Sequence, residues 1–348
     1  MKVEHLNGRR IRTPEGNFYY CSGTDYLGMA YHEGLKESII EAYAKYGLNY
    51  GSTRKHGLFD DIYERAETIF ANWLGLEAAL TVSSGTLAGQ LVRNFVRAHS
   101  YALIELPRLH PALKDIYEDQ IAQRMENKAQ ERLIDQINRH PAEKIALLTV
   151  AMDPLTSQPA DFSFLQAVEG KELLLILDDT HGLGVLGETG AGFIELFPSL
   201  RSEEVIVIGS LAKGISLPGG LIAGPQKWVK AIQNSGHFLG SSPISPAYLE
   251  AFSNQFAAYQ QRRLKLKDNI ELLKSEIQEK HKLGYFPDFP IFILPEEYAG
   301  ERLKELGIWI SSIRYPYPHS PLLNRLILNG AHEKEDILQV TARLNQIL

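Results

Sequence analysis

Two periods of hydrophobic residues alternate along the middle of the chain. Between residues 51 and 235, short apolar runs are separated by longer segments in which apolar residues recur every three or four positions. The short runs predict strands, and the continuous ones at Leu173–Leu177 and Val205–Gly209 are typical of strands buried on both faces. Strands that alternate with helices favour an α/β fold with a mostly parallel sheet covered by helices. The other predicted strands are Ala79–Val82, Tyr101–Leu106, Ile145–Met152 and Leu221–Gly224, and the predicted helices are Asp60–Leu74, Thr86–Ala98 and Leu113–Asn138.

The pattern changes on both sides of this region. Residues 1–50 are predicted to form a short arm with one helix near Leu35–Lys45. The segment after about residue 235 combines long helical stretches with short strands, which is typical of an α+β domain. We therefore expect an N-terminal arm (1–50), a large domain (51–235) and a small C-terminal domain (236–348). In the small domain we predict helices within Ser245–Lys280, Glu297–Leu306 and Glu333–Leu348, and strands at Asp288–Leu294 and Leu326–Leu328.

The composition is that of an ordinary globular protein, and it narrows the possible partners. The 348 residues are 44% hydrophobic and carry a formal net charge of -6 without a basic run, so we expect no nucleic-acid binding. No window approaches the ~20 apolar residues of a membrane span, and charged residues interrupt the first ten positions, unlike a signal peptide. The single cysteine, Cys21, fits a reducing compartment. We predict a soluble, cytoplasmic protein, and we predict no metal site.

Polar residues and glycines follow the buried strand at Leu173–Leu177. Asp178, Asp179 and His181 come at its carboxyl end, and glycines at 182, 184 and 187 allow tight turns. In an open parallel sheet, ligands bind at that edge. An alternative is a strand end with a solvated acidic turn, which would need neither the histidine nor three glycines.

Ser210 and Lys213 follow the second buried strand in the same way. A lysine just past a buried strand tends to have a lowered pKa, which a Schiff-base amine requires. Alternatives are an ordinary surface lysine and a Ser-Lys hydrolase.

Two further positions follow strands. Ser84, Gly85 and Thr86 lie between a predicted strand and a helix, where free backbone N–H groups and the helix dipole favour a phosphate. Plain N-capping by Ser84 is an equal alternative. His110 follows the strand Tyr101–Leu106 and could either stack on a planar ring or be an ordinary loop residue.

The order of these motifs resembles the α-oxoamine synthase branch of the pyridoxal-phosphate enzymes, to which 8-amino-7-oxononanoate synthases belong. The resemblance covers most of the chain. It implies the aspartate-aminotransferase-like fold (fold type I) and pyridoxal 5'-phosphate as cofactor. The segments that carry it are Asp25–Gly28, Gly51–Arg54, Trp73–Gly75, Ser84–Gly85, Asp178–Gly187, Ser210–Lys213 and Asn324–His332.

The resemblance also implies a role for each residue type. Lys213 would hold the cofactor as a Schiff base and act as general base, while Asp178 would pair with the pyridinium nitrogen. His181 would form a hydrogen bond to the phenolic oxygen of the cofactor, and His110 would stack on its ring. The phosphate would be bound by Ser84, Gly85, Thr86 and Ser210. Ser242 would contact the neighbouring subunit's phosphate, and Arg325 would bind the amino-acid carboxylate.

Several positions depart from the family pattern. Thr24 stands where an asparagine is expected near the substrate, Thr86 replaces an aromatic residue, and Ala151 and Pro154 replace a serine and a glycine. These changes leave the cofactor positions intact and concern the substrate and the reaction.

The resemblance implies a homodimer that condenses an amino acid with an acyl-CoA or acyl-carrier thioester. Alternatives are an aminotransferase, another pyridoxal-phosphate lyase or transferase, and a non-catalytic homologue, although a scaffold would need none of Asp178, His181 and Lys213.

Overall fold

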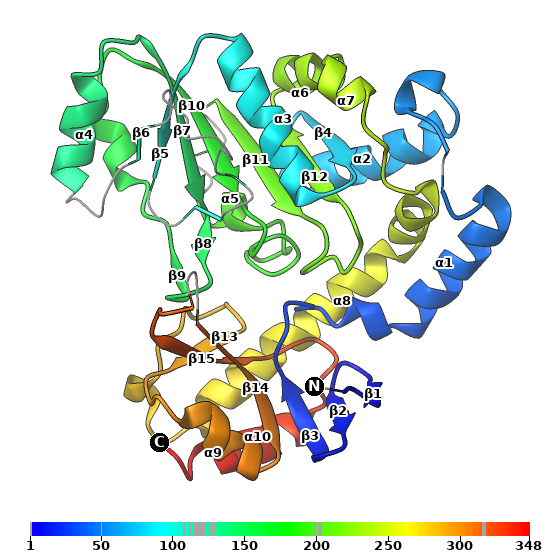
Figure 1. The fold of residues 1–348 in the computed structure, drawn as a ribbon, viewed down its shortest axis with the longest axis vertical. Coiled ribbons are helices and arrows are strands. Elements are labelled where there is room, and N and C mark those ends of the chain that lie inside the picture. The colour runs from blue at the N-terminus through cyan, green and yellow to red at the C-terminus, as the bar shows by residue number, and fades with distance from the viewer. Residues whose placement is uncertain are drawn as a thin grey trace.

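The alternating region in the middle of the chain forms the larger of two sheets (Figure 1). We describe a computed structural model that covers residues 2–49, 51–106, 109–110, 113, 123–124, 130–197, 200, 204–314 and 318–348. The larger sheet has seven strands in the order β4-β12-β11-β10-β7-β5-β6, and only β12 runs antiparallel to its neighbours. The predicted, mostly parallel sheet is thus confirmed. Its strands are β4 (Ala78–Val82), β5 (Ala102–Glu105), β6 (Gln123–Arg124), β7 (Lys144–Val150), β10 (Glu172–Asp178), β11 (Val205–Ser210) and β12 (Gly220–Gly224).

Both faces of this sheet are covered, as the continuous apolar runs predict. On β11, Val205 and Val207 belong to one buried cluster, and Ile206 and Ile208 belong to the other. Helix α2 (Asp60–Leu74) contributes to the first cluster and helix α3 (Gly85–Ala98) to the second. The other helices and the small β-hairpin near this sheet are α4 (Gln130–Asn138), α5 (Phe193–Leu196), α6 (Gln226–Gln233), α7 (Gly236–Leu239), β8 (Met152–Asp153) and β9 (Gln158–Pro159). The prediction of continuous helix over Leu113–Asn138 is wrong at β6, which pairs with β5; much of that segment lies outside the described residues.

The second sheet joins the two ends of the chain. Its six strands lie in the order β1-β2-β3-β14-β15-β13, so strands from the N-terminal segment pair with strands from the C-terminal one. The prediction of an arm with a single helix missed β1–β3, because these strands are short and are built mainly from polar and aromatic residues. The bounds are β1 (His5–Leu6), β2 (Arg10–Thr13), β3 (Gly16–Cys21), β13 (Ile291–Leu294), β14 (Ile308–Arg314) and β15 (Leu322–Ile327), with helices α1 (Glu33–Tyr46), α9 (Ala299–Glu305) and α10 (Lys334–Leu344) nearby.

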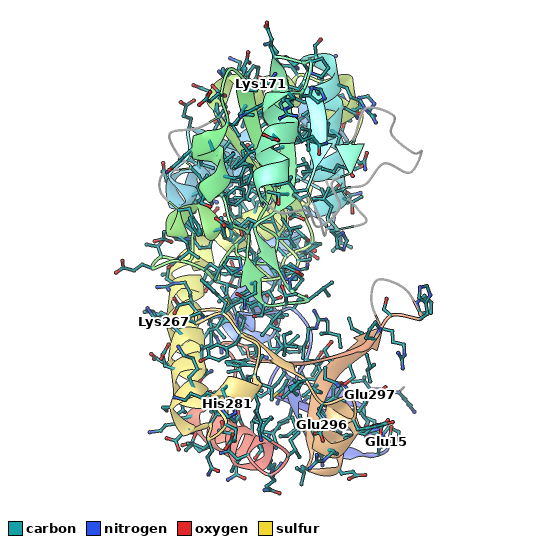
Figure 2. The ribbon with its side chains drawn as sticks, turned by 90° about the vertical axis from the view of Figure 1, so that its left-hand side faces the viewer. Glu15, Lys171, Lys267, His281, Glu296 and Glu297 are labelled. Carbon is teal, nitrogen blue, oxygen red and sulfur yellow. The ribbon has the colours of Figure 1, made fainter. Side chains whose placement is uncertain are left out.

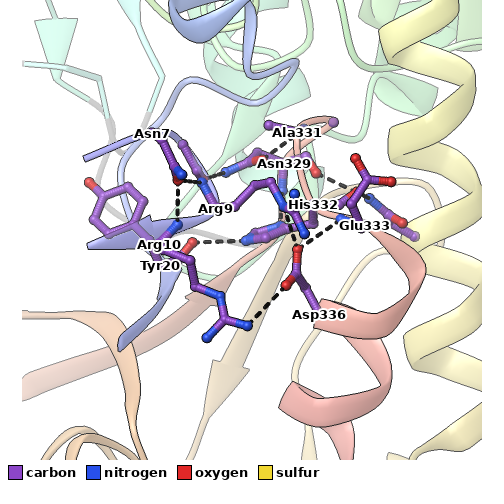
Figure 3. Close-up of polar contacts among 12 residues, drawn as sticks. Asn7, Arg9, Arg10, Tyr20, Asn329, Ala331, His332, Glu333 and Asp336 are labelled. Carbon is purple, nitrogen blue, oxygen red and sulfur yellow. Dashed lines mark hydrogen bonds and ion pairs between the residues drawn. The ribbon is translucent and has the colours of Figure 1, made fainter. Parts of the chain in front are cut away.

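A polar network fastens the N-terminal strands to the start of α10 (Figure 3). Asp336 binds Arg9 at 2.7 Å and Arg10 at 3.4 Å. The buried ring of His332 lies 2.9 Å from the carbonyl oxygen of Tyr20. Burial lowers the pKa of His332 to about 4, so a neutral ring donates to that carbonyl and accepts from the Asn329 amide. This network holds the segment after β3, which enters the site described below.

We call the parts of the structure built around the seven-stranded and the six-stranded sheet the large and the small unit. Helix α8 (Pro246–Glu276) connects these two units (Figure 1). In the turned view, Lys267 marks this helix, Lys171 lies at the outer end of the large unit, and Glu296 lies on the small one (Figure 2). The described helices include none that is both long enough and apolar enough to span a membrane.

A buried ion pair ties α2 to the strand that leads into the site. Glu67 accepts hydrogen bonds from the Thr81 amide (2.7 Å) and hydroxyl (2.8 Å) and from Arg54 (2.5 Å). Glu67→Ala would leave the Arg54 charge and both Thr81 donors without this acceptor. We expect a loss of about 3–5 kcal/mol in the free energy of unfolding, measured by urea denaturation. Glu64→Ala, which changes an exposed residue of the same helix, is the control. Equal stability of the two variants would contradict this account.

Candidate active site

A cavity of about 380 Å³ opens at the carboxyl ends of β4, β10 and β11. It brings together residues that lie far apart in the sequence, which is the arrangement expected at this edge of a parallel sheet. Eight of the predicted site residues line it: Ser84, Gly85, Thr86, His110, Asp178, His181, Ser210 and Lys213.

One wall of the cavity is the N-terminus of α3. The hydroxyl of Ser84 caps this helix by accepting from the Leu87 amide at 3.1 Å, so the capping interpretation holds for that side chain. The amides of Gly85 and Thr86 fall in the first turn, where a helix offers no partner, and both residues line the cavity. A β-carbon at position 85 would lie 2.9 Å from Cβ of Ser210, so only glycine allows the helix to approach β11 this closely. The site therefore combines a cap with an open, anion-attracting helix end.

Lys213 lies on the turn that follows β11. The hydroxyl of Ser216 binds Asp25, and the Ser216 amide donates to the carbonyl oxygen of Lys213 at 3.0 Å. The buried hydroxyl of Tyr259 donates to the carbonyl oxygen of Ile215 at 2.9 Å. This turn is therefore fixed from two sides. Burial lowers the pKa of Lys213 to about 8, so far more of the amine is neutral and nucleophilic near neutral pH than in an ordinary lysine.

His181 lies between Lys213 and a tyrosine. Its Nε2 atom is 2.7 Å from Nζ of Lys213, and its Nδ1 atom is 2.7 Å from the hydroxyl of Tyr26. Burial, together with the charges of Lys213 and Arg325, holds the pKa of His181 well below its usual range. The ring is therefore neutral and lies directly against the amine.

The two neighbouring aspartates differ in their surroundings. Asp178 lines the cavity and accepts from the Thr180 amide (3.1 Å) and hydroxyl (2.5 Å). Asp179 is fully buried elsewhere and accepts from the Phe193 amide at 2.7 Å. Burial raises the pKa of Asp178, while Thr180 and Lys213 oppose that shift. The carboxylate that can meet a ligand is thus Asp178.

Three predicted residues do not line the cavity. Arg325, on β15, is buried and donates to Oγ of Ser311 at 3.2 Å and to the carbonyl oxygen of Pro154 at 3.4 Å. It is still near enough to lower the pKa of Lys213. Thr24 lies in the loop after β3, where its carbonyl accepts from the Tyr26 amide. Ser242 is exposed in the segment after α7.

Tyr26 and Thr180, which bond to side chains of the site, are not among the predicted site residues. Tyr26 falls within Asp25–Gly28, a segment that carries the family resemblance but predicts no particular contact. Thr180 binds Asp178 and also accepts from the Ser210 amide at 2.9 Å, so it links the ends of β10 and β11. Its position, between two acids and a histidine, was the available signal. No local signal connects Tyr26 with a histidine 155 positions away.

The chain is similar to known proteins over most of its length. A family model described as "Aminotransferase class I and II" matches residues 25–344. An 8-amino-7-oxononanoate synthase from Petrotoga mobilis is 30% identical, over 96% of this chain and 87% of its own length. One from Fervidobacterium nodosum is 27% identical, over 96% of this chain and 91% of its own. The structure of serine palmitoyltransferase from Sphingomonas wittichii superimposes with a TM-score of 0.83 at 18% identity, covering 98% of this chain and 90% of that one.

Proposed function

The chain belongs to the aminotransferase class I and II family, and from that premise we propose that it is a pyridoxal-phosphate-dependent transferase that condenses an amino acid with an acyl thioester. One observation carries the proposal: a lysine with a lowered pKa, a carboxylate and an open helix end line a single cavity. The 8-amino-7-oxononanoate synthases, which align over nearly the whole chain, support the acyl-transfer chemistry.

The residues that line the cavity fit pyridoxal 5'-phosphate. When bound, this cofactor withdraws electrons from the α-carbon of an amino acid. The amides of Gly85 and Thr86 would hold its phosphate, because a helix N-terminus favours a group with nearly two negative charges. Lys213 would form the Schiff base and then carry a proton at Nζ, and Asp178 would keep a proton on the ring nitrogen. His110 and His181 would contact the ring face and its phenolic oxygen.

Arg325 is the residue that we assign to the substrate carboxylate. Its guanidinium is held by Ser311 and by the carbonyl oxygen of Pro154, so its orientation is fixed before a ligand arrives. A planar guanidinium suits a carboxylate because it can donate two parallel hydrogen bonds. Thr24 lies in the loop before Tyr26, and we propose that it lines the same substrate side.

An assay with paired substrates tests the proposed reaction. The purified protein is incubated with each amino acid, with and without acyl-CoAs of increasing length. Release of free CoA that depends on the amino acid supports acyl transfer. Repeated conversion of the amino acid to its oxo acid, when an added second oxo acid accepts the amino group and no acyl donor is present, would instead make the protein an aminotransferase. Separately, we propose a cytoplasmic location. The single cysteine, Cys21, is buried and free, which fits a reducing compartment.

We further propose that two copies of the chain form a homodimer with shared sites. Large apolar side chains are exposed at Ile40 (67%), Leu48 (75%) and Leu58 (59%), and such side chains favour burial against a second copy. Ser242 is exposed and outside the cavity of its own chain, where it could reach the partner's phosphate. We expect a dimer by sedimentation at micromolar concentration.

Subunit mixing tests the shared site. Lys213→Ala and Ser242→Asp, each inactive alone, should regain part of the activity when mixed, because one site of the hybrid dimer has both residues intact. Mixing Lys213→Ala with Asp178→Asn is the control: in the hybrid each subunit's own cavity carries one defect, so no site is restored. A fully active monomer, or no recovery between subunits that demonstrably exchange, would rule out the shared site.

A further inference from the structure

Tyr26 contacts the reactive lysine only through His181. The Tyr26 hydroxyl lies 2.7 Å from Nδ1 of His181, and Nε2 of the same ring lies 2.7 Å from Nζ of Lys213. Tyr26 and Lys213 come from distant parts of the sequence, and both belong to segments that are fixed by other contacts. The three side chains are therefore linked by two successive hydrogen bonds whose geometry is fixed by the fold.

The surroundings of the Tyr26 hydroxyl determine which group donates and which accepts in these hydrogen bonds. Tyr26 has no exposed surface, and burial raises its pKa, so the hydroxyl keeps its proton. Within the ranges that the structure describes, the hydroxyl has no hydrogen-bond partner other than Nδ1 of His181. A buried hydroxyl proton without an acceptor is costly. The proton is therefore donated to Nδ1, and a neutral ring then carries its own proton on Nε2.

We propose that Tyr26 is a positioning residue that fixes His181 as a donor at Nε2 and thereby favours the neutral amine of Lys213. An Nε2–H group can donate to the lone pair of a neutral amine, but it cannot pair with an ammonium, which has only donors. The inference deepens the proposed function, since it rests on Lys213 being the reacting amine.

The other groups around Lys213 do not make Tyr26 redundant. Asp178 favours the ammonium, whereas Arg325 disfavours it. Burial lowers the pKa of His110, and the nearby charge of Lys213 lowers it further. None of these groups sets the tautomer of His181, because within the described residues Nδ1 of His181 bonds to Tyr26. Without the Tyr26 hydroxyl, the ring can carry its proton on Nδ1 and accept from the ammonium at Nε2. The pKa of Lys213 then rises toward its ordinary value.

Competitive labelling measures this pKa without any catalytic assay. The full chain, freed of cofactor, is acetylated with trace acetic anhydride over a pH series that brackets the midpoint, and the Lys213 peptide is quantified against surface lysines. The wild type should titrate near pH 8. Tyr26→Phe should shift the midpoint upward by about one unit, so that labelling below the midpoint falls about tenfold. Tyr259→Phe is the matched control, because it removes a buried hydroxyl that bonds to Ile215 of the same turn and not to His181.

Three results would overturn the proposal: an unshifted midpoint in Tyr26→Phe, an equal shift in Tyr259→Phe, or a proton on Nδ1 of His181 in the wild type. The last is read from ring ¹⁵N chemical shifts, assigned by their loss in His181→Gln, and needs no tyrosine variant to fold. A wild type that titrates as expected yet forms no Schiff base with pyridoxal phosphate would refute the proposed function and leave the role of Tyr26 standing.

Discussion

Replacing Lys213 by alanine is expected to reduce turnover by at least about a thousandfold, because the variant loses the amine that we propose binds the cofactor covalently and moves the substrate proton. Removing a general base alone typically costs about 10²–10⁴ in rate. The fold should survive, since the side chain lies at the cavity wall. The turn is held by the Ser216 amide, which donates to the carbonyl oxygen of Lys213, and by the Tyr259 hydroxyl, which donates to the carbonyl oxygen of Ile215.

Borohydride reduction locates the lysine independently of activity. Reduced wild-type protein should carry the cofactor on the peptide that contains Lys213, and Lys213→Ala should carry none there. Lys227→Ala is the matched control, because Lys227 forms an exposed ion pair with Glu204 away from the cavity. Schiff-base formation should become faster as the pH rises through about 8, since only the neutral amine attacks an aldehyde. A reduced adduct on another lysine would refute the assignment, and protein that never binds the cofactor would refute the proposed class.

The large sheet could be predicted from the sequence because its strands are buried on both faces. Leu173–Leu177 and Val205–Gly209 are apolar throughout, so their pattern is unambiguous, and the residues that follow them necessarily meet at one sheet edge. For this reason the sequence alone is enough to group Asp178, His181 and Lys213 in one site. The bounds proposed for the arm and the two domains remain predictions.

The sequence was uninformative where contacts join distant segments through polar atoms. Strands β1–β3 are short and carry arginines such as Arg10 and Arg12, so their alternation is too brief to indicate a sheet. Strand β3 pairs with β14, which lies near the other end of the chain. The bond between Tyr26 and His181 has the same character, since it depends on the small unit holding the segment after β3 against the large one.

The choice between the two adjacent aspartates shows what the structure adds. The position after the strand fits either carboxylate, and the family resemblance alone points to Asp178. Asp178 lines the cavity, whereas Asp179 points into the glycine-rich turn and accepts from the amide of Phe193. A β-carbon at Gly182 would lie 2.0 Å from Oδ1 of Asp179, so the turn is packed tightly around that carboxylate. Asp179 is therefore assigned to holding the turn, and Asp178 to the ligand.

Asp178→Asn is accordingly expected to bind the cofactor and yet lose at least about a hundredfold in turnover. Asparagine keeps an oxygen for the amide and hydroxyl of Thr180, so the local structure should persist. It carries no negative charge, however, and cannot stabilise a proton on the ring nitrogen. The bound cofactor would then withdraw electrons from the substrate less well.

The same substitution removes the charge that favours the ammonium form of Lys213. The labelling midpoint of Lys213 should therefore fall in Asp178→Asn, which separates an electrostatic effect from misfolding. Asp179→Asn is the control: its remaining oxygen can still accept from Phe193, so the variant should keep most of its turnover and leave the midpoint of Lys213 near 8. If Asp178→Asn were as active as the wild type while Asp179→Asn was inactive, the carboxylate that serves the cofactor would be Asp179, and the geometry of the cavity would have been misinterpreted.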